Sequence, residues 1–323
     1  MTFYDDNVRH AVYLERYKAG VVRKIIARVR ELGWGIAGEV SAEDLQAMTR
    51  RNLDRLLARI SRIVQDGYAP IVVDIDKSLR DIASYEGEWQ ADALARIGLD
   101  VGVPSDADLW SAAYSRPFQG KLLREWLGDL PKATSARVRQ VIRQGYVDGA
   151  GPLEIARQIR GTRGRRGVMD ISIRGAEAMV RTAIAHTANA AREHTYRAND
   201  AIKRVQWVSV LDSRTTLICM GRDGKIYEVG KGPRPPAHIG CRSTVVPLTP
   251  GISAALKARA TYQDWLINQP ANVQDDILGT RRGKLFRDGG YTVDRFTDKS
   301  GKEYTLDELR AKDREAYDNA FAE

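Results

Sequence analysis

The amino-acid sequence predicts an α+β protein in three parts. A predominantly helical N-terminal region is expected over residues 1–130, a small α/β core with basic helices and short strands over residues 131–250, and a C-terminal extension over residues 251–323. Three observations lead to this prediction. Helical apolar periodicity dominates the first part, strand-like alternation appears only after residue 204, and the excess of Lys and Arg lies just before that alternation.

The N-terminal region has the pattern of consecutive amphipathic helices. Residues 7–32 carry a broad apolar face that is expected to end at the glycines of LGWG. A second helix is expected to begin at Ser41, with Ser41 and Asp44 as its capping residues, and to run to Val64. Further helices are predicted near 69–99 and 106–128, after which Pro131 should break the pattern. None of these segments carries a recognisable chemical motif.

The positive charge of the chain is regional. Residues 132–204 hold 15 Lys and Arg against 6 Asp and Glu, which matches the +9 net charge of the whole chain. Within this segment RGTRGRRG, residues 160–167, is too poor in apolar residues to pack, so it predicts a surface loop that presents Arg163, Arg165 and Arg166. Such a loop is either simply solvated or binds an acidic partner, such as nucleic acid or a negatively charged protein.

A helix over residues 173–200 follows the loop. At about 100° per residue its small apolar residues gather on one side. Arg174, Arg181 and Arg192 gather on the opposite side. This arginine stripe predicts either a solvated helix face or a surface that docks on phosphate or carboxylate.

The next part of the core is predicted to be a small β unit. VQWVSVLD, residues 205–212, alternates as a half-buried strand does. Asp223 and Gly224 then form a tight turn before a second strand, KIYEV, and residues 244–246 are expected to form a third.

Both cysteines of the chain and one of its four histidines fall within this β unit. Cys219, His238 and Cys241 have ligand types and a spacing that suit Zn²⁺, with Asp212 as a candidate fourth ligand. A complete C-x-x-C…H-x-x-C pattern would have cysteine in place of Thr216. The alternative is a packed pair of small thiols beside a turn histidine.

Sequence signals for enzymes are weak or missing. The zincin motif H-E-x-x-H, the phosphate-binding P-loop, the dinucleotide-binding glycine motif and the zinc-deaminase motif do not occur. We therefore expect no enzyme and no catalytic residues. The sequence also lacks a long apolar run and a signal-peptide pattern at its start, so no membrane partner is expected, and two cysteines favour a reducing compartment.

The segment LDSRTTLICMGRDGKIYEVGKGPRPPAHIGCRS, residues 211–243, resembles the signature of the Mu F-like phage minor head proteins, also called head morphogenesis proteins. The similarity covers roughly residues 130–310. The residues that match the signature are Asp212, Arg214, Thr215, Cys219, Asp223, Gly224, Pro235, Pro236, His238, Cys241 and Arg242.

This resemblance implies a structural minor head (capsid) protein of a tailed bacteriophage. Such a protein is associated with the portal and supports head assembly and DNA packaging or delivery. The implied partners are the portal protein, the major capsid protein and packaged double-stranded DNA. The implied location is the virion head near the portal vertex, and the host cytoplasm during assembly. Two alternatives are a DNA-binding internal head protein and a metal-dependent hydrolase delivered with the genome.

The C-terminal extension carries two further features. YQDWLINQP offers Trp265 and Leu266 as anchors on one helical turn. GTRRGKLFRDGG combines glycines with basic residues that include Arg281 and Arg282, and it predicts a surface loop or a contact to portal, capsid or DNA.

Overall fold

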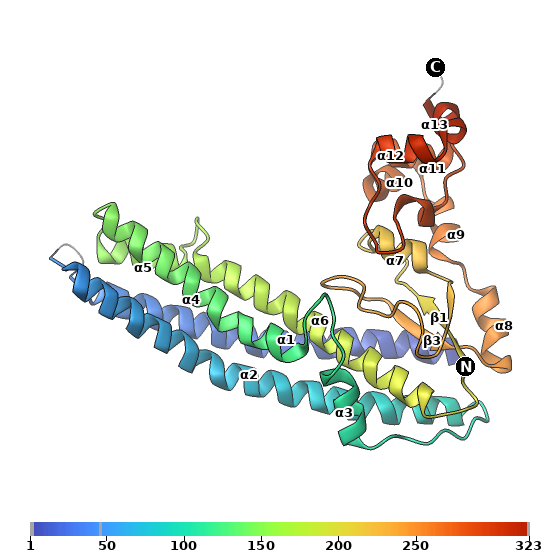
Figure 1. Ribbon diagram of the computed structural model, residues 1–323, viewed down its shortest axis with the longest axis horizontal. Helices are drawn as coiled ribbons and strands as arrows, with labels where there is room; N and C mark the ends of the chain where they lie inside the picture. Colours follow the sequence, from blue (N-terminus) through green and yellow to red (C-terminus); the bar gives the residue numbers. More distant parts are fainter. Residues whose placement is uncertain (1–2, 45–46, 322–323) are drawn as a thin grey trace. The chain divides into compact units, whose positions relative to one another are not determined.

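The structure of the chain is a computed structural model that describes residues 3–44 and 47–321 (Figure 1). It confirms the expected α+β class, with long helices first, a small sheet next and short helices last. The elements are α1 (Phe3–Ser41), α2 (Arg50–Ala95), α3 (Asp106–Tyr114), α4 (Leu123–Val147), α5 (Pro152–Arg160), α6 (Val168–Arg197), β1 (Arg204–Val208), α7 (Leu217–Arg222), β2 (Ile226–Glu228), β3 (Thr244–Pro247), α8 (Pro250–Ala258), α9 (Tyr262–Ile267), α10 (Ala271–Leu278), α11 (Thr280–Arg287), the 3₁₀ helix η1 (Val293–Phe296), α12 (Leu306–Lys312) and α13 (Arg314–Phe321).

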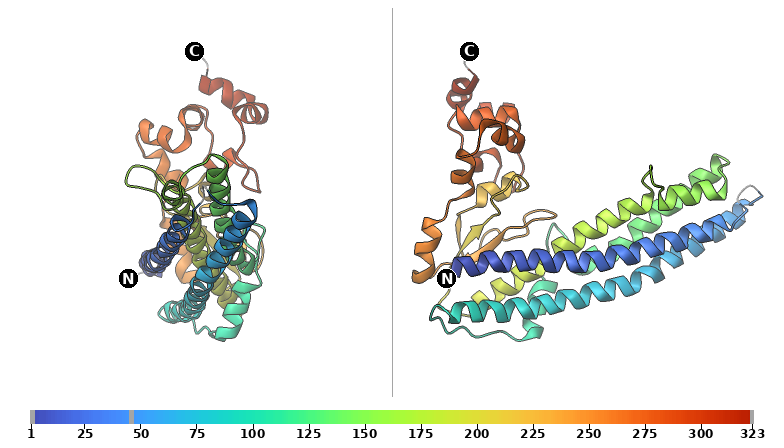
Figure 2. Two further views of the ribbon diagram at one scale, coloured as in Figure 1. Left: turned by 90° about the vertical axis from the view of Figure 1, so that its left-hand side faces the viewer. Right: turned by 180° about the vertical axis from the view of Figure 1, so that it is seen from behind.

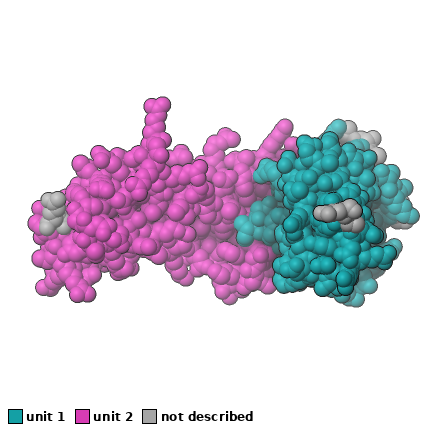
Figure 3. Space-filling model, turned by 90° about the horizontal axis from the view of Figure 1, so that it is seen from above, with its two compact units in different colours: residues 1–10, 86–105, 188–323 teal, residues 11–85, 106–187 magenta. Residues whose placement is uncertain are grey.

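Two compact units divide the chain in space (Figure 3). Unit 1 consists of Met1–His10, Glu86–Ser105 and Ala188–Glu323, and unit 2 of Ala11–Tyr85 and Asp106–Thr187. Helices α1, α2 and α6 contribute residues to both units. The units follow spatial contacts and not sequence order, so the boundaries at residues 130 and 250 remain a prediction.

Unit 2 is a bundle of long helices. Its parts of α1, α2, α4 and α6 run side by side in both directions of view (Figures 1 and 2). Buried apolar residues recur along each helix at the spacing of one face, as Val22, Ile25, Val29 and Ile36 do on α1. Within the described ranges, no helix combines the length and the apolar character that crossing a bilayer requires.

The predicted end of the first helix at LGWG is wrong, because α1 continues to Ser41. The apolar face persists through Ile36 and Val40, which are fully buried. Gly33 faces α6 so closely that a Cβ atom there would lie 2.9 Å from Cγ of Met169. The glycine therefore serves the packing of α1 on α6 and does not end the helix.

Two other predicted helix boundaries are also wrong. Ser41 is the last residue of α1, where its hydroxyl donates to the carbonyl of Gly38, and the next helix begins only at Arg50. Pro70 and Pro131 lie inside α2 and α4. Proline inside a helix costs about 3 kcal/mol or more. Burial of Pro131 in the bundle offsets that cost, so the pattern continues where local propensity predicts a break.

Unit 1 contains the sheet, whose strands are antiparallel in the order β2-β1-β3. The alternation predicted for the first strand is confirmed, because Val205 and Trp207 are buried whereas Gln206 and Val208 are only partly covered. The predicted second and third strands are also present. An apolar cluster joins Val205 and Val245 of the sheet to Leu94 of α2 and Tyr196 of α6.

The C-terminal extension is helical, and its apolar core also includes Leu217 and Met220 of α7. Its buried residues include Tyr262, Leu266, Leu285 and Phe296, so Leu266 anchors α9 within the chain itself. The surface loop expected around Arg281 and Arg282 is instead helix α11, because Leu285 and Phe286 on its inner face pack into this core.

A buried carboxylate, Glu86 of α2, lies at the meeting point of three helices in unit 1. Arg192 donates to it from α6 at 2.7 Å, His10 of α1 lies 2.7 Å from it, and Gln90 donates at 2.7 Å. A second nitrogen of Arg192 donates to the carbonyl of Val245 in β3 at 3.3 Å. Burial alone would raise the pKa of Glu86, but the charges of Arg192 and His10 outweigh it and lower this pKa to about 2.

Replacing Arg192 with Met is expected to lower the free energy of unfolding by about 3–5 kcal/mol, because the Glu86 carboxylate would stay buried without its guanidinium partner. Urea denaturation of the full chain, followed by circular dichroism, measures the loss. Arg174→Met is the matched control, since Arg174 is exposed on the same helix, and its effect should stay within about 0.5 kcal/mol. Equal losses in the two variants would contradict the role of Arg192.

Unit 2 should lose stability between pH 6.5 and 4 through His186. This ring is buried, lies 2.9 Å from the Ala113 carbonyl and stacks on Phe118. Burial lowers the pKa of His186 from 6.5 to about 4. The unfolded chain therefore binds more protons within this window, and stability falls as the pH drops, by about 3 kcal/mol in total.

Urea midpoints at pH 7 and pH 4.5 test this expectation. His186→Gln keeps a hydrogen-bond donor but does not titrate, so its stability should depend less on pH than that of the wild type. Parallel pH profiles of the two proteins would show that the ring does not contribute.

Candidate metal centre

The β unit positions the predicted cysteines and histidine around one point. Cys219 lies on α7, whose N-cap is Thr216, while His238 and Cys241 lie on the segment that leads into β3. The two cysteines form a buried cluster with Trp207 of β1, in which they are only 1% and 2% exposed. The sequence therefore predicted this grouping correctly.

The distances fit a tetrahedral ion site. Sγ of Cys219 lies 3.7 Å from Sγ of Cys241 and 3.3 Å from Nε2 of His238, and the three ligand atoms all lie within 4.8 Å of one another. A tetrahedral zinc ion with bonds to sulfur of about 2.3 Å places two sulfur atoms about 3.8 Å apart. Nδ1 of His238 lies 2.9 Å from the carbonyl of Ile239, which fixes the ring so that Nε2 faces the thiols.

The electrostatics of the cluster favour one thiolate. Hydrogen bonding from Cys219 and the nearby His238 lower the pKa of Cys241 well below its usual range. The same hydrogen bond and burial raise the pKa of Cys219. For His238, burial favours the neutral ring, but the hydrogen bond and charge of Cys241 outweigh it and raise the pKa. Thiolate sulfur and imidazole are the donors that zinc prefers.

Asp212, the candidate fourth ligand, is not part of this cluster. Its two carboxylate oxygens each accept a hydrogen bond of 2.7 Å from the guanidinium of Arg242. The backbone N–H of Arg214 donates to the same carboxylate at 3.0 Å, and the hydroxyl of Tyr262 donates to the Asp212 carbonyl at 2.7 Å. Hydrogen bonding from Arg242 lowers the pKa of Asp212. Asp212 and Arg242 are therefore a structural pair, and the expectation of Asp212 as a ligand is wrong.

Two further ion pairs stabilise the β unit, and neither was predicted from the sequence. Asp223 accepts from Arg259 and from the backbone N–H groups of Ser209 and Tyr262. Burial outweighs these contacts and raises the pKa of Asp223.

The second ion pair ties the loop after β2 to α6. Glu193 of α6 accepts from Arg234 at 2.8 Å, with both side chains 3% exposed. Arg234 also donates to the backbone carbonyls of Glu228 and Lys231. The two partners are 36 residues apart in the Asp223–Arg259 pair and 41 residues apart in the Glu193–Arg234 pair. A local sequence pattern therefore cannot predict either pair.

The predicted arginine stripe on α6 is wrong at Arg192, which is buried against Glu86. Arg174 is exposed, and Arg181 pairs with Glu177 at 2.9 Å. The helical periodicity placed Arg192 on the side opposite the small residues, where solvent was expected. Near the C-terminal end of α6, however, α2 and β3 cover that side.

The other predicted contact residues are more open. The loop predicted for residues 160–167 is present, and it exposes Arg163, Arg165 and Arg166. In α11, Arg281 is exposed and Arg282 donates to the carbonyl of Tyr304 at 2.9 Å. Their role in partner contacts remains a prediction.

Purified protein is expected to contain about one zinc ion per chain, and a chelator should lower its melting temperature, because metal binding energy contributes to folding. Cys241→Ser should lose the metal and destabilise the chain, whereas Ser213→Ala at an exposed position should do neither.

Thr216→Cys should tighten zinc binding, because the hydroxyl of Thr216 lies against Cys219 and a thiol there completes four ligands. Metal-free protein with a melting temperature that the chelator does not change would leave the cluster as a packing device.

Comparison with known proteins finds one family that resembles the part of the chain around the thiol cluster. Residues 136–246, from α4 to β3, match the family model described as "Phage Mu protein F like protein". No curated protein and no solved structure is significantly similar to the chain. The match covers about a third of the chain and includes the thiol cluster and the signature residues around it. Residues 136–246 of the chain are therefore similar to the Phage Mu protein F like family.

Proposed function

We propose that the protein is a minor structural component of the head of a tailed phage, associated with the portal, where it supports head assembly and the packaging or delivery of DNA. The observation that carries this proposal is the family match over residues 136–246. The family is one of structural head proteins, which also favours a function other than catalysis.

The architecture of the β unit supports a structural role. Its charged side chains pair internally: Asp212 binds Arg242, and Asp223 binds Arg259. The sulfur atoms of Cys219 and Cys241 are buried, so a substrate could reach a bound metal only from the side of His238. We propose zinc as a pin that holds α7 to the segment before β3, with Cys219, His238 and Cys241 as its ligands.

The exposed arginines supply the proposed partner contacts, separately on each unit. Arg163, Arg165 and Arg166 lie together on one loop of unit 2, and Arg281 is exposed on α11 of unit 1. Guanidinium groups suit carboxylates on the portal or major capsid protein as well as phosphates of packaged double-stranded DNA. Of these partners, we propose the portal as the one that recruits the chain into the head.

Co-expression with the portal protein of the same phage tests recruitment. The chain is expected to coelute with the portal oligomer in size-exclusion chromatography at low salt and to dissociate as salt rises. Replacing Arg163, Arg165 and Arg166 with Gln should weaken the complex by about tenfold or more, equivalent to ~1.4 kcal/mol.

Arg51→Gln combined with Arg62→Gln provides a control that removes two positive charges elsewhere, because both residues are exposed on α2 and no described residue forms an ion pair with either. A chain that never elutes with the portal would refute recruitment by that protein. A triple variant that binds as well as the wild type would remove the loop from the interface.

A further inference from the structure

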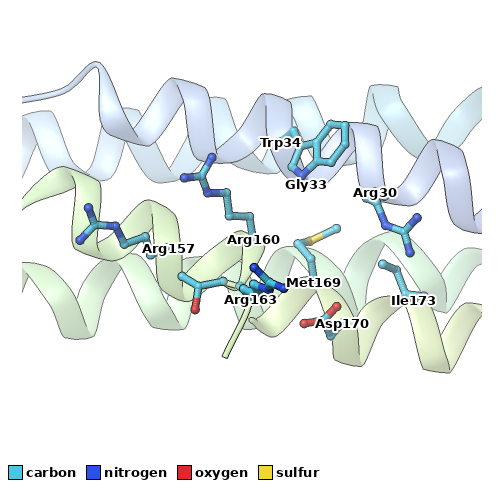
Figure 4. Close-up of a pocket in the computed structure, with 11 residues that line it drawn as sticks. Arg30, Gly33, Trp34, Arg157, Arg160, Arg163, Met169, Asp170 and Ile173 are labelled. Atoms are coloured by element: carbon cyan, nitrogen blue, oxygen red, sulfur yellow. The ribbon is translucent and has the colours of Figure 1, made fainter. Parts of the chain in front are cut away.

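A cavity of about 630 Å³ opens on unit 2 between α1, α5, the start of α6 and the 161–167 loop (Figure 4). This volume falls within the range of about 300–1,000 Å³ that is typical of pockets for small ligands. Its walls combine basic, aromatic and apolar side chains. The residues that matter here are Arg30 and Trp34 of α1, Arg157 and Arg160 of α5, Arg163 of the loop, and Asp170 of α6.

The cavity has a strong excess of positive charge. Four arginines line it, against the single carboxylate of Asp170. All four guanidinium-bearing residues are exposed, and none of them forms an ion pair with any residue that the structure describes. Figure 4 shows Arg160 reaching from α5 toward α1, and Arg30 pointing from α1 toward α6. Asp170 is already engaged, because its carboxylate accepts from the backbone N–H of Gly167 at 2.9 Å.

Trp34 adds an aromatic surface to this charge. Trp34 is 59% exposed, although most large apolar side chains of the bundle are buried. It lies one helical turn after Arg30, so the indole and that guanidinium share a face of α1. An exposed indole beside unpaired arginines is the combination that binds a nucleobase and its phosphates.

The walls are held in place before any ligand binds. Gly33 lets α1 approach Met169 of α6 closely, and a Cβ atom at Gly161 would lie 2.8 Å from the nitrogen of Gly167. Thr162 and Arg165 exchange backbone hydrogen bonds of 2.8 and 3.3 Å, which closes the loop that carries Arg163. These contacts fix the backbone on which the arginines stand, so binding orders only their side chains.

We infer that this cavity is a binding site for a single-stranded segment of nucleic acid, in which the arginines bind consecutive phosphates and Trp34 stacks on an unpaired base. A duplex fits these observations less well, because its bases are already stacked on one another and present only their edges. An acidic peptide would match the guanidinium groups but would leave the indole face without a partner. The inference adds a ligand to the proposed head protein and does not depend on docking to the portal.

Fluorescence anisotropy of the purified full chain with a fluorescein-labelled 12-mer of deoxythymidine tests the site. Trp34→Ala is expected to raise Kd for this strand by about 5- to 150-fold, the range for loss of one base stack, and Trp34→Phe should recover most of it. Arg157→Gln with Arg160→Gln should weaken binding and reduce the slope of log K against log salt by about 1.4, since each phosphate contact to a single strand contributes about 0.7.

The control is the Arg51→Gln, Arg62→Gln pair, which removes the same charge from exposed positions outside the cavity. A labelled duplex of mixed sequence is the second control, and Trp34→Ala should change its Kd less than twofold. The inference is overturned if Trp34→Ala leaves single-strand binding unchanged, if the control pair loses as much affinity as the Arg157 and Arg160 pair, or if the duplex binds more tightly than the strand. Because no portal or particle is present, these outcomes are independent of the test of recruitment.

Discussion

The architecture of unit 1 depends on satisfying one buried negative charge. Glu86 is fully buried, and a carboxylate in that position is tolerable only when hydrogen bonds and positive charge surround it. The partners come from α1, α2 and α6, and Arg192 extends the network to the backbone of β3. Apolar packing would allow these helices several rotations about their axes, whereas this geometry of donors selects one. The β unit is thereby attached to the helices that precede it in sequence.

The signature residues, 211–243, mainly stabilise the β unit, which lacks a large apolar core. Three short strands bury little surface, and polar ties supply the remaining order. Arg242 holds Asp212, Arg259 holds Asp223, and Arg234 holds Glu193. The partners of these ties lie 30, 36 and 41 residues apart in the sequence. The thiols and His238 add a fourth tie of a different chemical kind.

The sequence predicted what local patterns encode. Alternation located the first strand, the turn at Asp223 and Gly224 located the second, and ligand spacing located Cys219, His238 and Cys241. Helix boundaries were less accessible, because Gly33 and Pro131 have low helix propensity and only their tertiary contacts keep them helical. Arg192 was wrongly expected at the surface, because helical periodicity contains no information about its partner Glu86, which lies 106 residues earlier in the sequence. Glu86 follows the buried Leu79, Ile82 and Ala83 at helical spacing, so it lies on the buried face of α2. An acidic residue at a buried position of this pattern was the signal in the sequence that indicated a buried partner.

The burial of both sulfur atoms has a practical consequence for how this region moves. Thiolates react readily with maleimides and disulfide reagents, but only when the reagent can reach them. Cys219 and Cys241 are the only cysteines of the chain, and both are almost completely enclosed. The rate of their chemical labelling therefore measures how often α7 lifts away from the segment before β3. The two native thiols therefore report local opening without an engineered cysteine, and their labelling rates can be compared between the free and the assembled protein.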